Sequence, residues 1–207
     1  LADLRRVFGS DGQPGELRSR LSKPEDSDVF VYVASHGLVS GPDAKGYLLP
    51  VDARTDDVAS TALALQDLYA ALGQVGARTT MLVLEASFTR SLVDIANPPN
   101  LPQDDVVAMP ENPVPGLAVF KASDRDQQTL QAPEYGSGPF TRYFIAGLAG
   151  DADAAPIGNG DKSIDTVELF VYTADMVRTA ARKSFGMEQK PLLSRIDNLT
   201  VGRLAAR

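Results

Sequence analysis

The chain of 207 residues contains no cysteine, no tryptophan and only one histidine. Without cysteine it can form neither disulfide bonds nor thiolate metal sites, which leaves its redox compartment and its localisation unknown. Its 20 basic and 27 acidic residues give a net charge of −7, and the basic ones form no cluster that could bind a phosphate backbone. No apolar stretch is long enough to span a bilayer. We therefore expect no nucleic-acid partner and no membrane span, and the acidic charge favours basic peptides as ligands.

The remaining composition is ordinary for a globular protein, with 43% hydrophobic and 23% charged residues. A chain of this length can bury a sizeable core within a single domain, 1–207. Apolar periodicity and turn residues predict helices between strands, which is typical of an α/β fold. They also predict a long loop over 37–60, with a short extended piece at 46–51. We expect strands over 28–34, 79–84, 117–122 and 192–204, and helices over 2–8, 15–21, 61–72, 140–150 and 165–183.

Two apolar runs each lead into a residue of a reactive type. The first run, 29–34, precedes the lone histidine His36, and the second, 81–84, precedes Ser87. Runs of this kind are typical of buried parallel strands. Because functional sites in open α/β sheets form at the carboxyl ends of strands, we expect His36 and Ser87 to face each other across one crevice.

Several short motifs resemble, in the same order along the chain, the caspase-like peptidases of the metacaspase and bacterial caspase-homologue type. That family has a strand ending Tyr-Tyr-Ser-Gly-His-Gly, then Gly-Tyr-Leu-Leu-Pro-Val-Asp-Ala, and a later strand ending Leu-Asp-Ala-Cys-Phe-Ser-Gly. The segments that resemble the family are Tyr-Val-Ala-Ser-His-Gly at 32–37, Gly-Tyr-Leu-Leu-Pro-Val-Asp-Ala at 46–53, Leu-Glu-Ala-Ser-Phe-Thr-Arg at 84–90, the pocket-like segment 122–129, Gly-Pro-Phe-Thr at 138–141 and Gln-Lys-Pro at 189–191.

The resemblance implies a three-layer α/β/α caspase-like sandwich with a mostly parallel sheet and an antiparallel last strand. It also implies six core strands, of which the patterns above provide four. We therefore expect the first strands upstream of Leu1, either in a longer protein or in a second polypeptide that supplies them. Within the chain, the resemblance implies a large-subunit-like part, 1–90, a loop or cleaved linker, 91–115, and a small-subunit-like part, 116–207.

The resemblance also implies roles for individual residues. His36 stands at the position of the general base, Ser87 at that of the nucleophilic cysteine, and the amide of Gly37 at the oxyanion hole. Glu85 and Asp126 stand where acidic residues line a pocket for an Arg or Lys side chain, and a carboxylate pair matches a guanidinium in charge and geometry. The simpler interpretation of the two carboxylates is solvated surface groups.

The motif around Ser87 departs from the family at several positions. Ser35 stands in place of glycine, Glu85 in place of aspartate, and Thr89 and Arg90 in place of serine and glycine. A serine hydroxyl is a weak nucleophile unless a base and an orienting group activate it, and the Gly-x-Ser-x-Gly elbow of serine hydrolases is absent. The alternative is that Ser87 is a serine nucleophile activated by His36.

These observations favour a caspase-like pseudo-peptidase that binds basic peptides or a partner. The alternatives are an Arg/Lys-specific endopeptidase captured as a Cys-to-Ser variant, and a scaffold that pairs with an active homologue. We expect no cofactor and no metal. The acidic segment 151–168 suggests calcium, but its spacing does not fit the EF-hand loop, so a solvated loop followed by a helix cap is the favoured interpretation.

Overall fold

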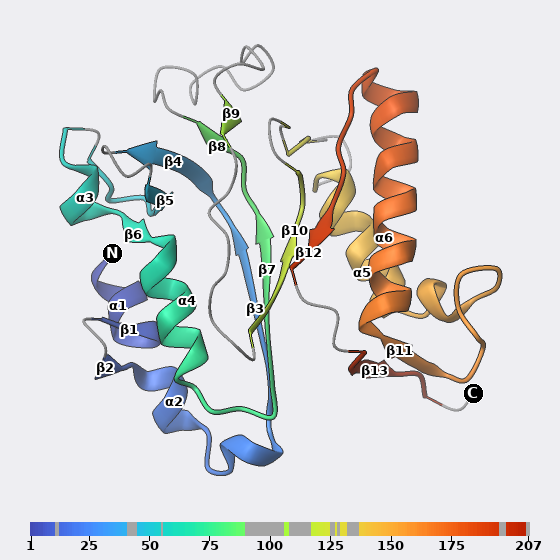
Figure 1. Ribbon diagram of the computed structural model, residues 1–207, viewed down its shortest axis with the longest axis horizontal. Coiled ribbons are helices and arrows are strands. Elements are labelled where there is room, and N and C mark those ends of the chain that lie inside the picture. Colours follow the sequence, from blue (N-terminus) through green and yellow to red (C-terminus); the bar gives the residue numbers. More distant parts are fainter. Residues whose placement is uncertain are drawn as a thin grey trace.

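A four-stranded sheet forms the centre of the computed structural model, in the order β12-β10-β7-β3 (Figure 1). Strands β3, β7 and β10 run parallel, whereas β12 is antiparallel to β10. The strands are β3 (Asp28–Ala34), β7 (Thr79–Glu85), β10 (Leu117–Lys121) and β12 (Leu192–Leu193). The structure describes residues 1–10, 13–40, 45–54, 56–89, 106–107, 117–124, 127, 129–131, 137–194 and 198–205.

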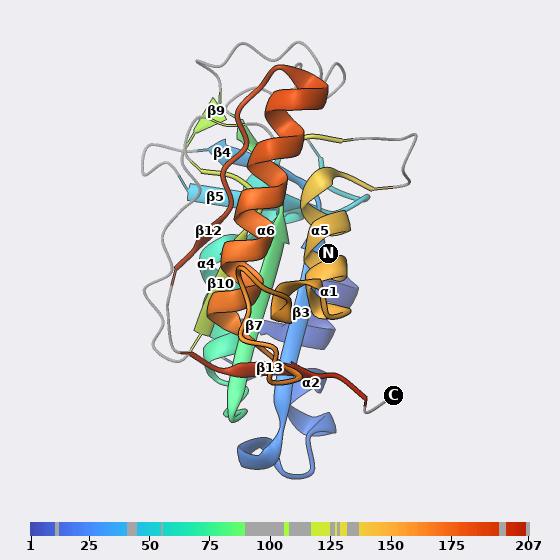
Figure 2. The ribbon, with the colours of Figure 1, turned by 90° about the vertical axis from the view of Figure 1, so that its right-hand side faces the viewer.

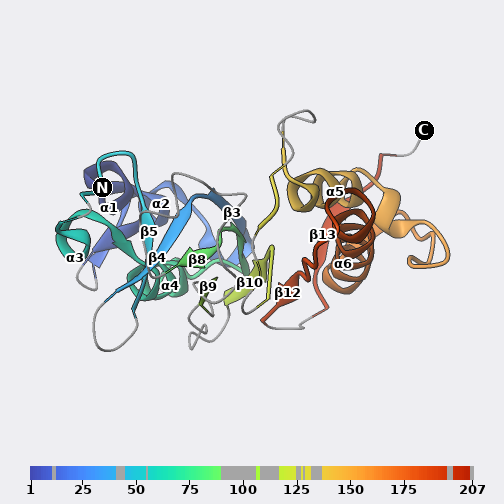
Figure 3. The ribbon, with the colours of Figure 1, turned by 90° about the horizontal axis from the view of Figure 1, so that it is seen from above.

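Side chains of the central strands alternate between two apolar cores. Helices lie on both faces of the sheet, so the fold has three layers (Figures 1 and 3). On β7, Leu82 and Leu84 enter one core, and Met81 and Val83 enter the other. The first core is covered by α1 (Ala2–Phe8), α2 (Glu16–Arg20) and α4 (Leu65–Gly73), and the second by α5 (Pro139–Leu148) and α6 (Thr166–Ala180). This arrangement is the expected three-layer α/β/α sandwich with a mostly parallel sheet and an antiparallel last strand.

The helix predicted over 61–72 is present as α4, and four apolar residues along one side of it are buried. Leu65, Leu68, Tyr69 and Leu72 are each at most 1% exposed. The helix begins at Leu65, later than predicted, because Thr61 ends the short helix α3 and Leu63–Ala64 form the short strand β6. The elements that connect the first half of the chain are β1 (Gly9–Ser10), β2 (Gln13–Pro14), η1 (Pro24–Asp26), α3 (Val58–Thr61) and β6 (Leu63–Ala64).

The loop predicted over 37–60 is wrong for its first part, which forms a second, five-stranded sheet in the order β6-β5-β4-β8-β9. Strands β4 and β5 pair antiparallel, and their side chains Leu38, Val39, Tyr47 and Leu48 are buried. Of the short extended piece predicted at 46–51, the first four residues lie in β5. The strands not yet given are β4 (His36–Ser40), β5 (Lys45–Leu49), β8 (Phe88–Thr89) and β9 (Val106–Val107).

The single strand predicted over 192–204 is also wrong. Only two residues, Leu192–Leu193, pair with β10 as β12, and the chain then pairs with a different element (Figure 2). Strand β13 (Thr200–Arg203) lies antiparallel to β11 (Ser163–Asp165), which directly precedes α6. The remaining short elements are η6 (Asp151–Asp153) and η7 (Ala181–Phe185).

Strand β3 lies at one edge of the central sheet, where its only partner in the described part of the chain is β7. Its alternate side chains Phe30 and Tyr32 are 44% and 48% exposed. The expected loop or linker over 91–115 lies outside the described residues except for the two residues of β9. Within the described residues, no helix is both long and apolar enough to cross a membrane.

Candidate functional site

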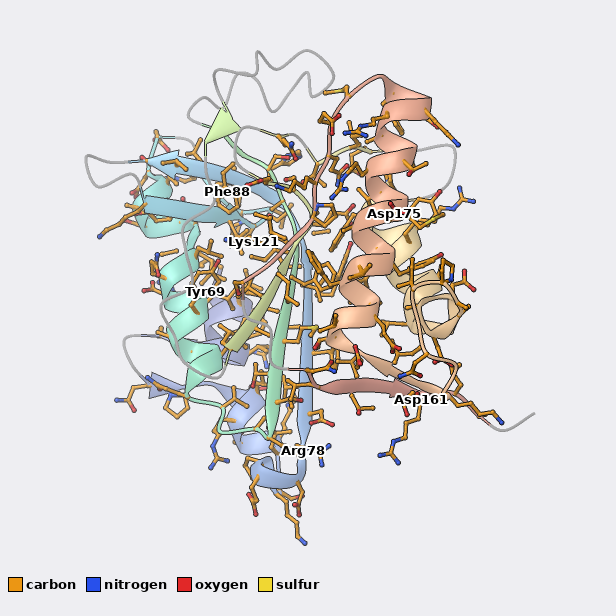
Figure 4. All side chains as sticks on the ribbon, turned by 45° about the vertical axis from the view of Figure 1, so that its right-hand side comes forward. Tyr69, Arg78, Phe88, Lys121, Asp161 and Asp175 are labelled. Carbon is orange, nitrogen blue, oxygen red and sulfur yellow. The ribbon has the colours of Figure 1, made fainter. Side chains whose placement is uncertain are left out.

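The backbones of His36 and Ser87 lie side by side at the carboxyl end of the central sheet. The chain leaves β3 through Ser35 into β4, and leaves β7 through Ala86 and Ser87 into β8, and β4 and β8 pair in parallel at Gly37 and Phe88. Two further backbone bonds join the segments, from the Ser35 amide to the Glu85 carbonyl (3.3 Å) and from the Gly37 amide to the Ser87 carbonyl (3.1 Å). Figure 4 shows Phe88 and Lys121 at this end of the sheet and Arg78 at the opposite end.

Gly37 is required by the close approach of the neighbouring strand. A Cβ on Gly37 would lie 2.7 to 2.9 Å from ring atoms of Phe88, closer than real contacts allow. Its amide has one proton, which is donated to the Ser87 carbonyl. An oxyanion role for Gly37 therefore requires release of this hydrogen bond.

The side chains of His36 and Ser87 are not hydrogen-bonded to each other. His36 is exposed, and its imidazole makes no hydrogen bond to any described residue. The Ser87 hydroxyl is half-buried, and its Oγ accepts a hydrogen bond of 2.5 Å from the Thr129 amide. In this arrangement, the hydroxyl oxygen is held by a backbone donor and makes no hydrogen bond to a general base among the described residues.

Glu85 is a buried side chain at the centre of a hydrogen-bonded group that joins β3, β7 and α5. Its carboxylate is 5% exposed, and Oε2 accepts from the hydroxyls of Tyr32 and Thr141, which themselves lie 2.7 Å apart. Burial, and next the hydrogen bond to Glu85, raise the pKa of Tyr32 to about 12. The other carboxylate oxygen, Oε1, is buried and has no hydrogen-bond partner among the described residues.

The backbone of Gly138 approaches Glu85 closely at the start of α5. A Cβ on Gly138 would lie 2.3 Å from the Leu130 carbonyl oxygen and 2.7 Å from Glu85 Oε1. Glu85 is therefore enclosed by its surroundings, unlike the solvated surface carboxylate of the simpler interpretation. Asp126, the second acidic residue expected in the pocket, lies outside the described residues.

Sequence reasoning missed the residues that contact the expected site residues. Tyr32 and Thr141 bind Glu85, and Thr129 binds Ser87. Thr129 and Thr141 do lie in segments that resemble the family, and Gln189 of the Gln-Lys-Pro motif contacts the same region. Only the position of these residues within the motifs could have identified them.

The acidic loop before α6 is organised by hydrogen bonds to its own backbone. The predicted capping box is confirmed, because Asp165 accepts from the Glu168 amide and Glu168 accepts from the Asp165 amide. Asp153 and Asp161 likewise accept from the amides of Lys162 and Ser163. No group of three or more acidic or histidine side chains in the described segments could hold a metal ion.

Comparison with known proteins identifies the fold. No family model and no curated protein matches the chain. The crystal structure of caspase-1 from Spodoptera frugiperda is similar, with a TM-score of 0.55 and 13% sequence identity over 93% of this chain and 72% of that chain. At this identity the likeness shows the caspase fold alone. It confirms the expected fold class, and the metacaspase type stays a prediction.

Proposed function

We propose that this chain is a caspase-fold pseudo-peptidase that no longer cleaves peptides and binds basic ones through Glu85. One observation carries the first part of this proposal. Ser87 stands where the motif resemblance expects a cysteine, and its Oγ accepts from the Thr129 amide without any bond to His36.

The chemistry of the site favours loss of cleavage. A serine hydroxyl must lose its proton to a base as it attacks, and an orienting group must hold that base in place. The exposed His36 has no such group among the described residues. The Gly37 amide is also committed to the Ser87 carbonyl, so one expected donor to an oxyanion is occupied.

The unpartnered oxygen of Glu85 supports binding of a basic side chain. A buried carboxylate oxygen without a hydrogen-bond partner is costly, and an Arg or Lys side chain would provide the missing donor and a compensating charge. Because Oε1 lies against Gly138, the backbone at the start of α5 has to shift when such a side chain enters. Asp126 is the second proposed contact.

Peptide binding tests the second part of the proposal. We expect a fluorescent peptide ending in Arg to bind more tightly than the same peptide ending in uncharged citrulline. Glu85→Gln keeps the size of the side chain and removes its charge, so it should weaken Arg-peptide binding about tenfold or more. Equal affinity for the Arg and citrulline peptides would disprove basic-peptide binding.

Cleavage of fluorogenic Arg and Lys peptides tests the first part. We expect background rates from the unsubstituted chain and from His36→Ala. If the serine form cleaves and loses activity with His36→Ala, the pseudo-peptidase proposal is wrong. If only Ser87→Cys cleaves, serine alone silences an otherwise intact site, and the alternative of an Arg/Lys endopeptidase captured as a Cys-to-Ser variant gains support.

The edge of β3, which has no strand partner among the described residues, favours a scaffold role as a second candidate. An edge strand of seven residues with exposed Phe30 and Tyr32 can accept a further strand from a second polypeptide or an active homologue. In that case, β3 amides should gain protection from hydrogen exchange when an active caspase-fold peptidase is added. Unchanged exchange along β3 would argue against pairing at this edge.

A further inference from the structure

Gln189 is a fully buried polar side chain that belongs to no helix or strand. It lies between η7 and β12 and is 0% exposed. Burial of an amide is unfavourable unless both its carbonyl and its amino group find partners. Both do: Oε1 accepts from the Leu130 amide at 3.0 Å, and Nε2 donates to the Ala122 carbonyl at 2.9 Å.

These two partners lie at the two ends of one segment, 122–130, which follows β10. A single side chain therefore fixes both ends of the segment at once. The next residue along the chain contacts the middle of the segment: the Lys190 amide donates to Gln127 Oε1 at 2.7 Å, and Lys190 Nζ lies 3.4 Å from Asp124 Oδ2. Residues 189–190 thus hold the segment at its start, middle and end.

The held segment is the one that contacts Ser87. Consecutive amides of the segment have different acceptors, because the Thr129 amide donates to Ser87 Oγ and the Leu130 amide donates to Gln189 Oε1. The two peptide groups that flank Thr129 are therefore held by one bond each, one to Ser87 and one to Gln189. A second contact, between the hydroxyls of Thr129 and Ser123 at 3.2 Å, also lies within the segment.

We infer that Gln189 is a positioning residue, which holds the Thr129 amide on the side-chain atom at position 87. Gln189 acts on that atom through the Leu130 amide, to which its Oε1 is bonded. Its effect is to aim a backbone N–H at the place where a nucleophile stands in the caspase fold. Such a donor favours a negative charge on the atom that it faces.

A thiol at position 87 reports this donor directly. The chain has no cysteine, so Ser87→Cys introduces the only thiol. Its ionisation can be followed by the ultraviolet absorbance of the thiolate and by the pH dependence of alkylation. A thiolate that accepts the Thr129 amide should form below the ordinary pKa of about 8.5.

Removal of the Gln189 hydrogen bonds should reverse part of this effect. Gln189→Met keeps the length of the side chain but neither accepts nor donates, so the Leu130 and Thr129 peptides are released. We expect the pKa of the thiol to rise by about one unit, which leaves about tenfold less thiolate at a fixed pH below the pKa. Gln127 is partly exposed, and Gln127→Ala removes only the contact with the Lys190 amide at the middle of the segment. It should therefore also raise the pKa of the thiol, but by a smaller amount.

Other charged groups near position 87 are held constant by the design. Among the described residues, the titratable side chains on the packed elements are His36 on β4, Glu85 on β7, Lys121 on β10, and Asp124 with its partner Lys190. An imidazolium at His36 would also lower the pKa of the thiol. The titrations are therefore repeated with His36→Asn, and the effect of Gln189→Met should persist in that background.

The control is Gln74→Met, which alters an exposed glutamine after α4 and should leave the thiol unchanged. Circular dichroism establishes that each variant is folded. The inference is overturned if folded Gln189→Met and Gln127→Ala both leave the pKa of the thiol unchanged, or if Ser87→Cys alone shows no lowered pKa. The experiment uses no peptide, so it can succeed or fail independently of basic-peptide binding.

Discussion

At the scale of single residues, two glycines determine how closely the site is packed. Gly37 admits the ring of Phe88 against β4, and Gly138 admits the Leu130 carbonyl and Glu85 Oε1 against the start of α5. Neither position needs the left-handed backbone that usually explains a glycine, since Gly138, for example, has φ of −67°. The absence of a side chain is therefore what these positions require.

A methyl group at position 138 should destabilise the protein. Gly138→Ala would place Cβ 2.3 Å from one backbone oxygen and 2.7 Å from the enclosed carboxylate, so the chain must shift. Overpacking of this kind costs about 1–3 kcal/mol, and we expect that decrease in the free energy of urea unfolding. Gly202→Ala is the matched control, because its Cβ would meet Ile164 at an ordinary 3.5 Å. Equal stability of the two variants would contradict the close approach.

At the scale of elements, the start of α6 depends on a reciprocal cap. Asp165→Ala removes the acceptor for the Glu168 amide and also the bond from Asn198 to the same carboxylate. We expect a loss of about 1 kcal/mol in unfolding free energy. Glu168→Ala should lower the unfolding free energy less in the Asp165→Ala variant than in the unsubstituted chain, because the two side chains act together. Asp175→Ala, on the exposed face of the same helix, is the control. Additive losses would show that the cap does not act as a unit.

The elements also show which features can be predicted from sequence. The stripe of α4 and the cap of α6 depend on residues three or four apart, so their patterns predict them correctly. The β4–β5 pair and the division of β12 from β13 depend on partners that local patterns do not identify, and both were missed. The same holds within the site. The carboxyl ends of β3 and β7 are predictable, whereas Tyr32 and Thr141 meet at Glu85 across 109 residues of sequence.

At the scale of the whole molecule, tyrosine hydroxyls join parts of the sandwich that are distant in sequence. Tyr32 joins the edge strand β3 to α5 through Glu85 and Thr141, and Tyr172 joins α6 to η6 through Asp151. Burial first, and then the acidic partner, raise the pKa of Tyr32 and of Tyr172 to about 12 in each case. Burial also raises the pKa of Tyr69.

These shifts predict that the protein loses stability in alkaline solution. The folded state holds the phenolic protons more tightly than the unfolded chain, whose tyrosines have a pKa of 10.0. The resulting stabilisation is complete below pH 10.0 and declines as the pH rises towards 12. The midpoint of urea unfolding should therefore fall over that range. The double variant Tyr32→Phe, Tyr172→Phe starts from a lower midpoint and should fall less steeply, with Tyr69 responsible for part of the remainder. If the midpoint falls equally steeply in the unsubstituted chain and in the double variant, these two hydroxyls do not cause the loss of stability.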